Sequence, residues 1–313
     1  MIDATALDQI SKMAWFAVAA RDLHWWVGTY GGDAHDTTLV RGEGAAIAAG
    51  GYVGITERSN TGWTAYLFDG ATGHQSIQTS VQSSPLILAT PGRPGQLFVA
   101  DAGDGSSGTV LEFSSGAPGK EVVSASPKNE AGDLTVFNLS ASGSTLLHSY
   151  CSEVACRATI VGTAGTVTLD SDLFPVATTD LSVLAFEDLD GRHVTVVDIV
   201  SGERTPLVDP EGSIQRPISR AIPLDDTTFL VDSGAELFAV DTRTGSVRRL
   251  LGLAARTGWD VSASPVGGRW LLLHRVKVDG GPVLTTDQLR SIGVLDLQTG
   301  LLSESIFTLP FAP

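Results

Sequence analysis

The sequence predicts an all-β fold, because one strand-and-turn pattern recurs along a chain of short alternating strands. The pattern is a strand of alternating apolar residues, then Asp, two variable residues, Thr or Ser, and Gly. In such a turn the Asp side chain accepts backbone N–H groups and the Gly takes a positive φ. We name these turns the Asp turns. They occur in AYLFDGATG at 65–73, VTVVDIVSG at 194–202, LFAVDTRTG at 237–245 and IGVLDLQTG at 292–300.

The spacing of the Asp turns predicts a repeated unit. Asp198 and Asp241 are 43 residues apart, and Asp69 and Asp198 are 129 residues apart, which is three times that interval. Two degenerate copies fit the gap, TVLEFSSGAPG at 109–119 and CRATIVGTAG at 156–165. The repeat length is therefore about 45 residues, as in a β-propeller blade.

A second pattern supplies the other strands of each repeat. NLSASGSTLLHSY at 138–150 parallels VSASPVGGRWLLLHR at 261–275, each with a short strand, a Ser/Pro/Gly turn and an apolar strand. Each repeat then holds four strands, and the Asp turn joins the third to the fourth. A sheet of this size cannot bury both faces alone, so such sheets stack as the blades of a β-propeller.

The number of blades follows from the remaining strand signals. Residues 13–20, 23–30 and 37–40 read as further strands and add a seventh blade to the six repeats. We expect seven four-stranded blades, with six as the alternative, in a single β-propeller domain over 1–313. We also expect strands from the two chain ends to share one sheet, because this hides edges that invite aggregation.

These repeats resemble a known family. The segments SASPVGGRWLLL and NLSASGSTLLHS resemble the SPDG turn of TolB-like (PD40) propeller repeats, and the Asp-turn hairpins look like those of TolB-like and PQQ-like propellers. The resemblance covers most of 45–306. It implies a β-propeller, a fold that serves binding scaffolds, peptidase gating domains, lactonases and lyases, and so selects no single function.

The composition excludes two classes of partner. The chain has 35 Asp and Glu against 20 Lys and Arg, a net charge of −15, and no basic cluster that could release counterions from nucleic acid. The same acidic surface repels anionic headgroups. The longest apolar run, 13–20, is much shorter than the ~18 residues that cross a bilayer, so we expect no transmembrane segment.

The two cysteines indicate the cellular compartment in which the protein is expected. Cys151 and Cys156 flank a four-residue hairpin loop, a position that suits disulfide geometry. Two free thiols and half of a metal site are the alternatives, and zinc normally needs more ligands than this chain places nearby. A disulfide implies an oxidising compartment, so we expect an extracellular protein or an exported ectodomain. Residues 1–20 do not read as a signal peptide, so we expect the leader to be missing from this sequence.

Motifs for cofactors and metals read as turns. Residues 103–108 match G-x-G-x-x-G, but a strand rather than a helix follows them, as in a hairpin loop. The Asp-rich segments that begin at Asp170 and Asp188 resemble the start of an EF-hand loop but lack the Glu that ends one. Asp33, His35 and Asp36 suit a polar hairpin turn better than a metal site. We therefore expect neither a cofactor nor a bound metal.

A binding surface is predicted from the connections between strands. If the Asp turns occupy one face of the propeller, the longer and more varied loops gather on the other, where binding residues are concentrated. Trp and Arg on such loops are enriched in binding surfaces. The candidate binding residues are Trp63, Arg216, Arg256, Trp259, Asp260 and Lys277.

The sequence favours an exported, non-catalytic propeller that binds a protein or glycan through this loop-rich face. The basis is that no assembled nucleophile, base or metal motif occurs in the sequence. The alternative is a propeller enzyme, a lyase or hydrolase, whose site at the mouth of the central channel draws residues from several blades.

Overall fold

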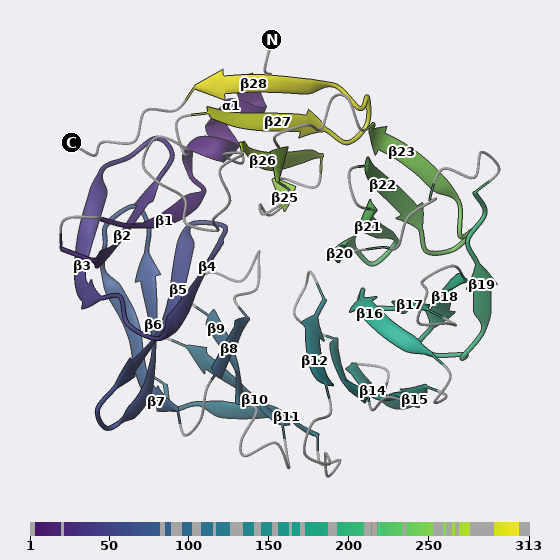
Figure 1. The fold of residues 1–313 in the computed structure, drawn as a ribbon, viewed down its shortest axis with the longest axis horizontal. Coiled ribbons are helices and arrows are strands. Elements are labelled where there is room, and N and C mark those ends of the chain that lie inside the picture. Colours follow the sequence, from purple (N-terminus) through teal and green to yellow (C-terminus); the bar gives the residue numbers. More distant parts are fainter. Residues whose placement is uncertain are drawn as a thin grey trace. The chain divides into compact units, whose positions relative to one another are not determined.

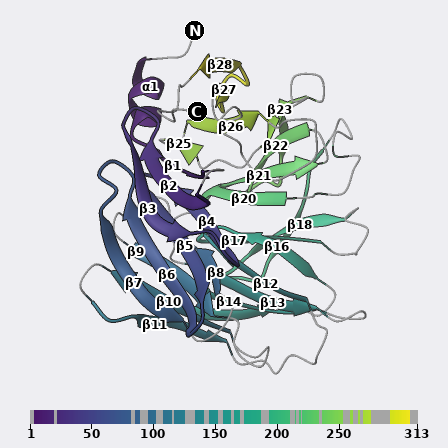
Figure 2. The same cartoon turned by 60° about the vertical axis from the view of Figure 1, so that its left-hand side comes forward.

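The alternating strands form seven small antiparallel sheets in the computed structural model (Figures 1 and 2). The chain divides into two compact units. Unit 1 contains Met1–Asp104, Thr109–Val122 and Gly258–Pro313, and unit 2 contains Gly105–Gly108 and Val123–Thr257. The residues that the structure describes are 4–19, 22–81, 85–88, 96–101, 108–114, 117–125, 134–140, 145–151, 156–162, 165–169, 173–186, 193–209, 214, 218, 220–233, 236–252, 259–260, 265–266, 269–275 and 291–306.

Unit 1 holds the short helix α1 (Ala4–Ser11) and four sheets. The first sheet has β1 (Ala14–Val18), β2 (His24–Thr29) and β3 (Ala34–Val40). The second has β4 (Gly44–Ala49), β5 (Tyr52–Ser59), β6 (Gly62–Asp69) and β7 (Gln75–Val81). The third has β8 (Pro85–Leu88), β9 (Gln96–Asp101), β10 (Gly108–Ser114) and β11 (Lys120–Ala125). The fourth has β24 (Trp259–Asp260), β26 (Trp270–Arg275), β27 (Ser291–Asp296) and β28 (Leu302–Ile306), and β25 (Pro265–Val266) also pairs with β26.

Unit 2 holds three four-stranded sheets. One has β12 (Leu134–Leu139), β13 (Leu146–Cys151), β14 (Cys156–Gly162) and β15 (Gly165–Leu169). The next has β16 (Phe174–Thr178), β17 (Ser182–Phe186), β18 (Val194–Asp198) and β19 (Arg204–Pro206). The last has β20 (Arg220–Asp225), β21 (Thr228–Ser233), β22 (Glu236–Asp241) and β23 (Val247–Leu251).

The predicted fold class is confirmed: the chain is an all-β propeller of seven blades. The four Asp turns join the third strand of a sheet to the fourth, as predicted, and the two degenerate copies do the same in β10–β11 and β14–β15. The first blade differs from the prediction, because its described residues form three strands. Whether 1–313 is one domain stays a prediction.

The prediction that the two chain ends share a sheet is wrong for the described strands. β1 pairs with β2, and β28 pairs with β27, so each end stays within its own sheet. Side-chain packing joins the first and last sheets of unit 1 instead: Trp15 and Ala17 of β1 pack in one buried cluster with Trp270 and Leu272 of β26. Ile10 of α1, a helix that the strand pattern did not predict, is fully buried in the same cluster.

Neighbouring sheets within each unit bury their faces against each other. In unit 1, Val27 and Val53 belong to a cluster shared by the first two sheets, and in unit 2, Leu184 and Phe229 belong to one shared by the β16–β19 and β20–β23 sheets. Burial of this kind contributes roughly 25 cal/mol per Å² of apolar surface and compensates for the small size of each sheet. No described helix is long and apolar enough to cross a bilayer.

Each Asp turn is fixed by its own carboxylate. Asp198 Oδ1 accepts the N–H groups of Val200 at 3.0 Å and Ser201 at 2.7 Å, and the Ser201 hydroxyl at 2.8 Å. The Gly202 N–H donates to the Asp198 carbonyl at 2.9 Å, with the glycine at φ 72°. The corresponding glycines of the other turns have similar φ values, Gly73 68°, Gly245 68° and Gly300 70°.

A further bond ties each Asp turn to the first hairpin of its own sheet. The N–H of the residue after the Asp donates to a carbonyl in the turn between the first two strands, so both turns are held together at one end of the sheet. The four bonds are Gly70 to Gly51 at 2.8 Å, Ile199 to Leu181 at 2.9 Å, Thr242 to Thr227 at 2.9 Å and Leu297 to Arg269 at 2.8 Å.

We expect two glycine substitutions in the Asp turns to lower the free energy of unfolding by different amounts. A Cβ at positive φ costs roughly 1–2 kcal/mol. At Gly245 this Cβ would also lie 2.3 Å from the Pro206 carbonyl oxygen, whereas at Gly202 it would meet nothing within 4 Å. We expect Gly202→Ala to lower the free energy of unfolding by about 1 kcal/mol and Gly245→Ala by at least about 2 kcal/mol, measured by urea denaturation with circular dichroism. Equal losses would contradict this geometry.

Asp296 carries an ion pair in addition to its turn. Arg269 Nη2 lies 2.8 Å from Asp296 Oδ2, and the Arg269 Cζ lies 5.3 Å from the centroid of the Trp270 ring. Hydrogen bonds from the Arg269 side chain, and next from the Gln298 N–H, outweigh burial and hold the pKa of Asp296 at about 2, below its ordinary 3.8.

This depressed pKa predicts a loss of stability in acid. Because the folded pKa lies below the unfolded one, the Asp296 carboxylate stabilises the fold above about pH 4, and this contribution disappears as the pH falls toward 2. We expect Asp296→Asn to lower the urea midpoint at pH 6 and to make its decline between pH 4 and pH 2 shallower than in the unsubstituted protein. A decline of the same steepness in both proteins would contradict the role of this ion pair.

Candidate functional site

The structure describes three of the six predicted binding residues. Arg216, Arg256 and Lys277 are outside the described residues. Trp259 and Asp260 form the short strand β24, whose backbone pairs with β26, so the predicted loop ends before these two residues. The binding role of all five residues stays a prediction.

Trp63 lies on a strand rather than in a loop. The sequence favours a turn-like segment over Glu57–Thr64, and this prediction is wrong, because β5 and β6 extend through the segment and leave only a two-residue turn between Ser59 and Gly62. The Trp63 side chain is half-buried and packs against the apolar cluster shared by the β4–β7 and β8–β11 sheets. This packing explains why a large aromatic residue occupies the position, and its binding role stays a prediction.

The backbone brings the two cysteines opposite each other. Cys151 ends β13, Cys156 begins β14, and the two are paired residues across the hairpin. Paired residues in an antiparallel ladder have Cα atoms about 4.5–5.5 Å apart, which lies within the range that disulfides span. The disulfide itself stays a prediction.

The paired cysteines lead to a thiol test. We expect protein secreted into an oxidising compartment to show no thiol before reduction and two after it, assayed with a thiol-reactive dye in denaturant. Because the closed loop is short, we expect the paired substitution of Cys151→Ser and Cys156→Ser to lower the free energy of unfolding by only about 2 kcal/mol. Two free thiols in freshly secreted protein would rule out the disulfide.

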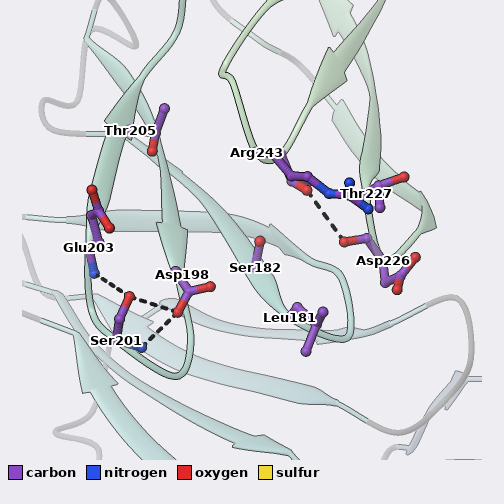
Figure 3. A pocket seen from close by; sticks show the side chains of 10 residues that line it. Leu181, Ser182, Asp198, Ser201, Glu203, Thr205, Asp226, Thr227 and Arg243 are labelled. Atoms are coloured by element: carbon purple, nitrogen blue, oxygen red, sulfur yellow. Dashed lines mark hydrogen bonds between the residues drawn. The ribbon is translucent and has the colours of Figure 1, made fainter.

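Unit 2 contains a polar pocket with a volume of about 390 Å³ (Figure 3). It is formed by the turns at one end of the β16–β19 and β20–β23 sheets. Its charged lining residues are Asp198, Glu203, Asp226 and Arg243. Its other lining residues are Leu181, Ser182, Ser201, Thr205, Thr227 and Thr242.

Backbone hydrogen bonds hold the pocket walls in place. On the first wall, the Asp198 turn is tied to the first hairpin of its sheet through Ile199 and Leu181. On the second, the Thr242 N–H donates to the Thr227 carbonyl at 2.9 Å, and the Thr242 hydroxyl donates to the Asp226 carbonyl at 3.4 Å. The pocket is therefore built from paired turns rather than from long loops.

The pocket is electrically negative. Hydrogen bonds from Ser201, first its backbone N–H, outweigh burial and lower the pKa of Asp198, so this carboxylate is ionised at neutral pH. Glu203 and Asp226 are exposed and form no ion pair with any described residue. Three carboxylates thus face one guanidinium, that of Arg243, and the lining contains no histidine or cysteine.

The pocket carboxylates do not converge as metal ligands do. Among the described residues, only Asp22, His24 and Asp36 bring three ligand atoms within 4.8 Å of one another. Of the three residues that we interpret from the sequence as a polar hairpin turn, Asp33 directly precedes β3, and His35 and Asp36 lie on β3. Both Asp36 carboxylate oxygens lie 3.1 Å from His24 Nδ1, and Oδ1 accepts the Thr38 N–H at 2.7 Å, so these side chains fix the β2–β3 hairpin.

Sequence reasoning missed this pocket because it lies on the Asp turns rather than on the longer loops. The available signal was the acidic residues next to those turns in consecutive repeats. Glu203 directly follows the first turn, and the pair Asp225–Asp226 stands in the hairpin of the next repeat. Glu203 and Asp226 each add a negative charge beside an Asp, Asp198 or Asp225, whose carboxylate is hydrogen-bonded within its own turn.

Comparisons with known proteins show the fold. No family model matches the sequence, and no curated protein matches it. A solved prolyl endopeptidase structure is similar over 96% of this chain and 50% of that chain, with a TM-score of 0.58 and 10% sequence identity. This chain therefore matches half of the length of that peptidase, and a likeness at this identity concerns the fold alone. Membership in the TolB-like family stays a prediction.

Proposed function

We propose that the chain is an exported, non-catalytic β-propeller that binds a protein or glycan partner through the pocket of unit 2. The observation that carries the proposal is the pocket itself, which is lined by three carboxylates and five hydroxyl groups from the turns and strands of two neighbouring sheets. The pocket volume of about 390 Å³ lies within the range of ligand-binding clefts, in which placed polar groups fix the orientation of the ligand. The loop-rich face and its candidate residues remain a second, predicted surface.

The lining chemistry favours recognition over catalysis. A general base that works near neutral pH is most often a histidine, or a carboxylate with a raised pKa. The pocket has no histidine, and the pKa of Asp198 is lowered by its hydrogen bonds. The enzyme alternative, a lyase or hydrolase with a site at the mouth of the central channel, stays a prediction.

Export is supported by the paired positions of Cys151 and Cys156 in the β13–β14 hairpin. A disulfide there would persist only in an oxidising compartment. Two free thiols in the thiol test above would remove this support for export.

The proposed function predicts that filling the pocket abolishes partner binding. Leu181 is 44% exposed at the pocket. Leu301, beside the Asp turn of β27–β28, is 68% exposed and is not among the residues that line the pocket. We expect the protein to bind some members of immobilised peptide and glycan panels, and Leu181→Trp to reduce that binding at least tenfold. The matched control, Leu301→Trp, should bind like the unsubstituted protein. No binding to either panel, or unchanged binding by Leu181→Trp, would contradict the proposal.

A further inference from the structure

We propose that the pocket of unit 2 receives the cationic side chain of an arginine or lysine residue in a partner peptide, an inference that rests on the proposed binding function.

The carboxylates are arranged on two walls. Asp198 and Glu203 come from the turn between β18 and β19, and Asp226 comes from the hairpin between β20 and β21, with Leu181 drawn between them (Figure 3). A cation held between the walls interacts with negative charge on both sides. Charge-assisted hydrogen bonds from N⁺–H to carboxylate are about twice as strong as neutral ones.

An organic cation fits this arrangement better than a metal ion. A metal ion needs its oxygen ligands around one point, at about 2.0–2.6 Å. The carboxylate oxygens of Asp198, Glu203 and Asp226 do not all lie within 4.8 Å of one another, as the ligand atoms of the Asp22 group do. A guanidinium or ammonium group on a flexible stem can instead reach separated carboxylates, and a guanidinium presents five N–H donors.

The uncharged lining suits the rest of such a side chain. Leu181 offers an apolar surface for the methylene groups, which arginine and lysine pack along apolar contacts while the charged head stays hydrated. The hydroxyl groups of Thr205 and Thr227 can accept further N–H bonds. The lining has no aromatic ring on which a sugar could stack, which favours a peptide over a glycan.

The overall charge argues against a second copy of this chain as the partner. At a net charge of −15, two copies repel each other, whereas a basic partner is attracted. The partner that fits is therefore a protein or peptide segment that displays arginine or lysine.

The test compares two ligands that differ in charge but hardly in shape. Titrations of the full chain, followed by NMR, use N-acetyl-L-argininamide and its neutral counterpart N-acetyl-L-citrullinamide. We expect the arginine ligand to bind at least about tenfold more tightly, and more weakly as salt is added. Spermidine is a third ligand, and tighter binding of spermidine than of the arginine ligand would overturn the assignment to a peptide side chain.

Substitutions assign the effect to the pocket. We expect Asp226→Asn and Glu203→Gln each to weaken binding of the arginine ligand about threefold, and the two together about tenfold. Arg243→Gln should instead tighten it, because it removes the one cation of the lining; a merely structural role would not produce this. The matched control, Glu121→Gln, changes the net charge by the same amount at an exposed position of β11 outside the pocket and should have no effect.

The outcomes separate the two proposals. Equal binding of the arginine and citrulline ligands, with loss of both in Leu181→Trp, would overturn the charge assignment and leave the binding function standing. Binding of neither ligand, together with binding to neither panel, would overturn both. Weakening by Glu121→Gln to the same degree as by Asp226→Asn would show attraction by the whole chain and overturn the pocket assignment.

Discussion

A carboxylate that accepts hydrogen bonds from its own turn sets the local geometry of this propeller. In the Asp198 turn, one oxygen accepts two backbone N–H groups and a hydroxyl, while the following residue bonds to the first hairpin of the same sheet. Asp241 repeats this arrangement in full. Asp69 accepts the N–H and the hydroxyl of Thr72, and Asp296 accepts the Gln298 N–H, while the residue after each of them bonds to the first hairpin in the same way. One end of each of these sheets is thereby held together without long loops, and the pocket of unit 2 forms between such turns in the β16–β19 and β20–β23 sheets.

Burial between sheets supplies the rest of the stability. Each sheet is too small to bury both faces alone, and within each unit its apolar side chains pack against the next sheet. Polar contacts also cross these interfaces. The buried Glu57 accepts hydrogen bonds from the indole Nε1 of Trp25 and from the Gly42 N–H, and so links the first two sheets of unit 1. A buried carboxylate without hydrogen-bond partners would lower the free energy of unfolding, so these two bonds stabilise the interface between the sheets.

The sequence predicts the turns well because their chemistry is local. An Asp, a Thr or Ser and a Gly at fixed spacing determine the turn, and all four Asp turns and both degenerate copies were placed correctly. Contacts between distant residues were not predictable in this way. The packing of Trp15 against Trp270, and the burial of Ile10 from a helix with no acidic residue in its first turn, depend on which strands become neighbours. Trp63 was misplaced because its polar flanking residues look like a loop when they belong to an extended hairpin. The pocket was missed because its residues belong to two repeats, and their proximity is a property of packing rather than spacing.

The assignment of an arginine or lysine side chain to the pocket of unit 2 depends on a cationic group entering that pocket. A crystal structure of the protein with saturating N-acetyl-L-argininamide tests this most directly. We expect the guanidinium to lie within hydrogen-bond distance of the Asp226 and Glu203 carboxylates, with its methylene stem against Leu181. A pocket left empty at saturation, or a ligand whose guanidinium points into solvent, would contradict it.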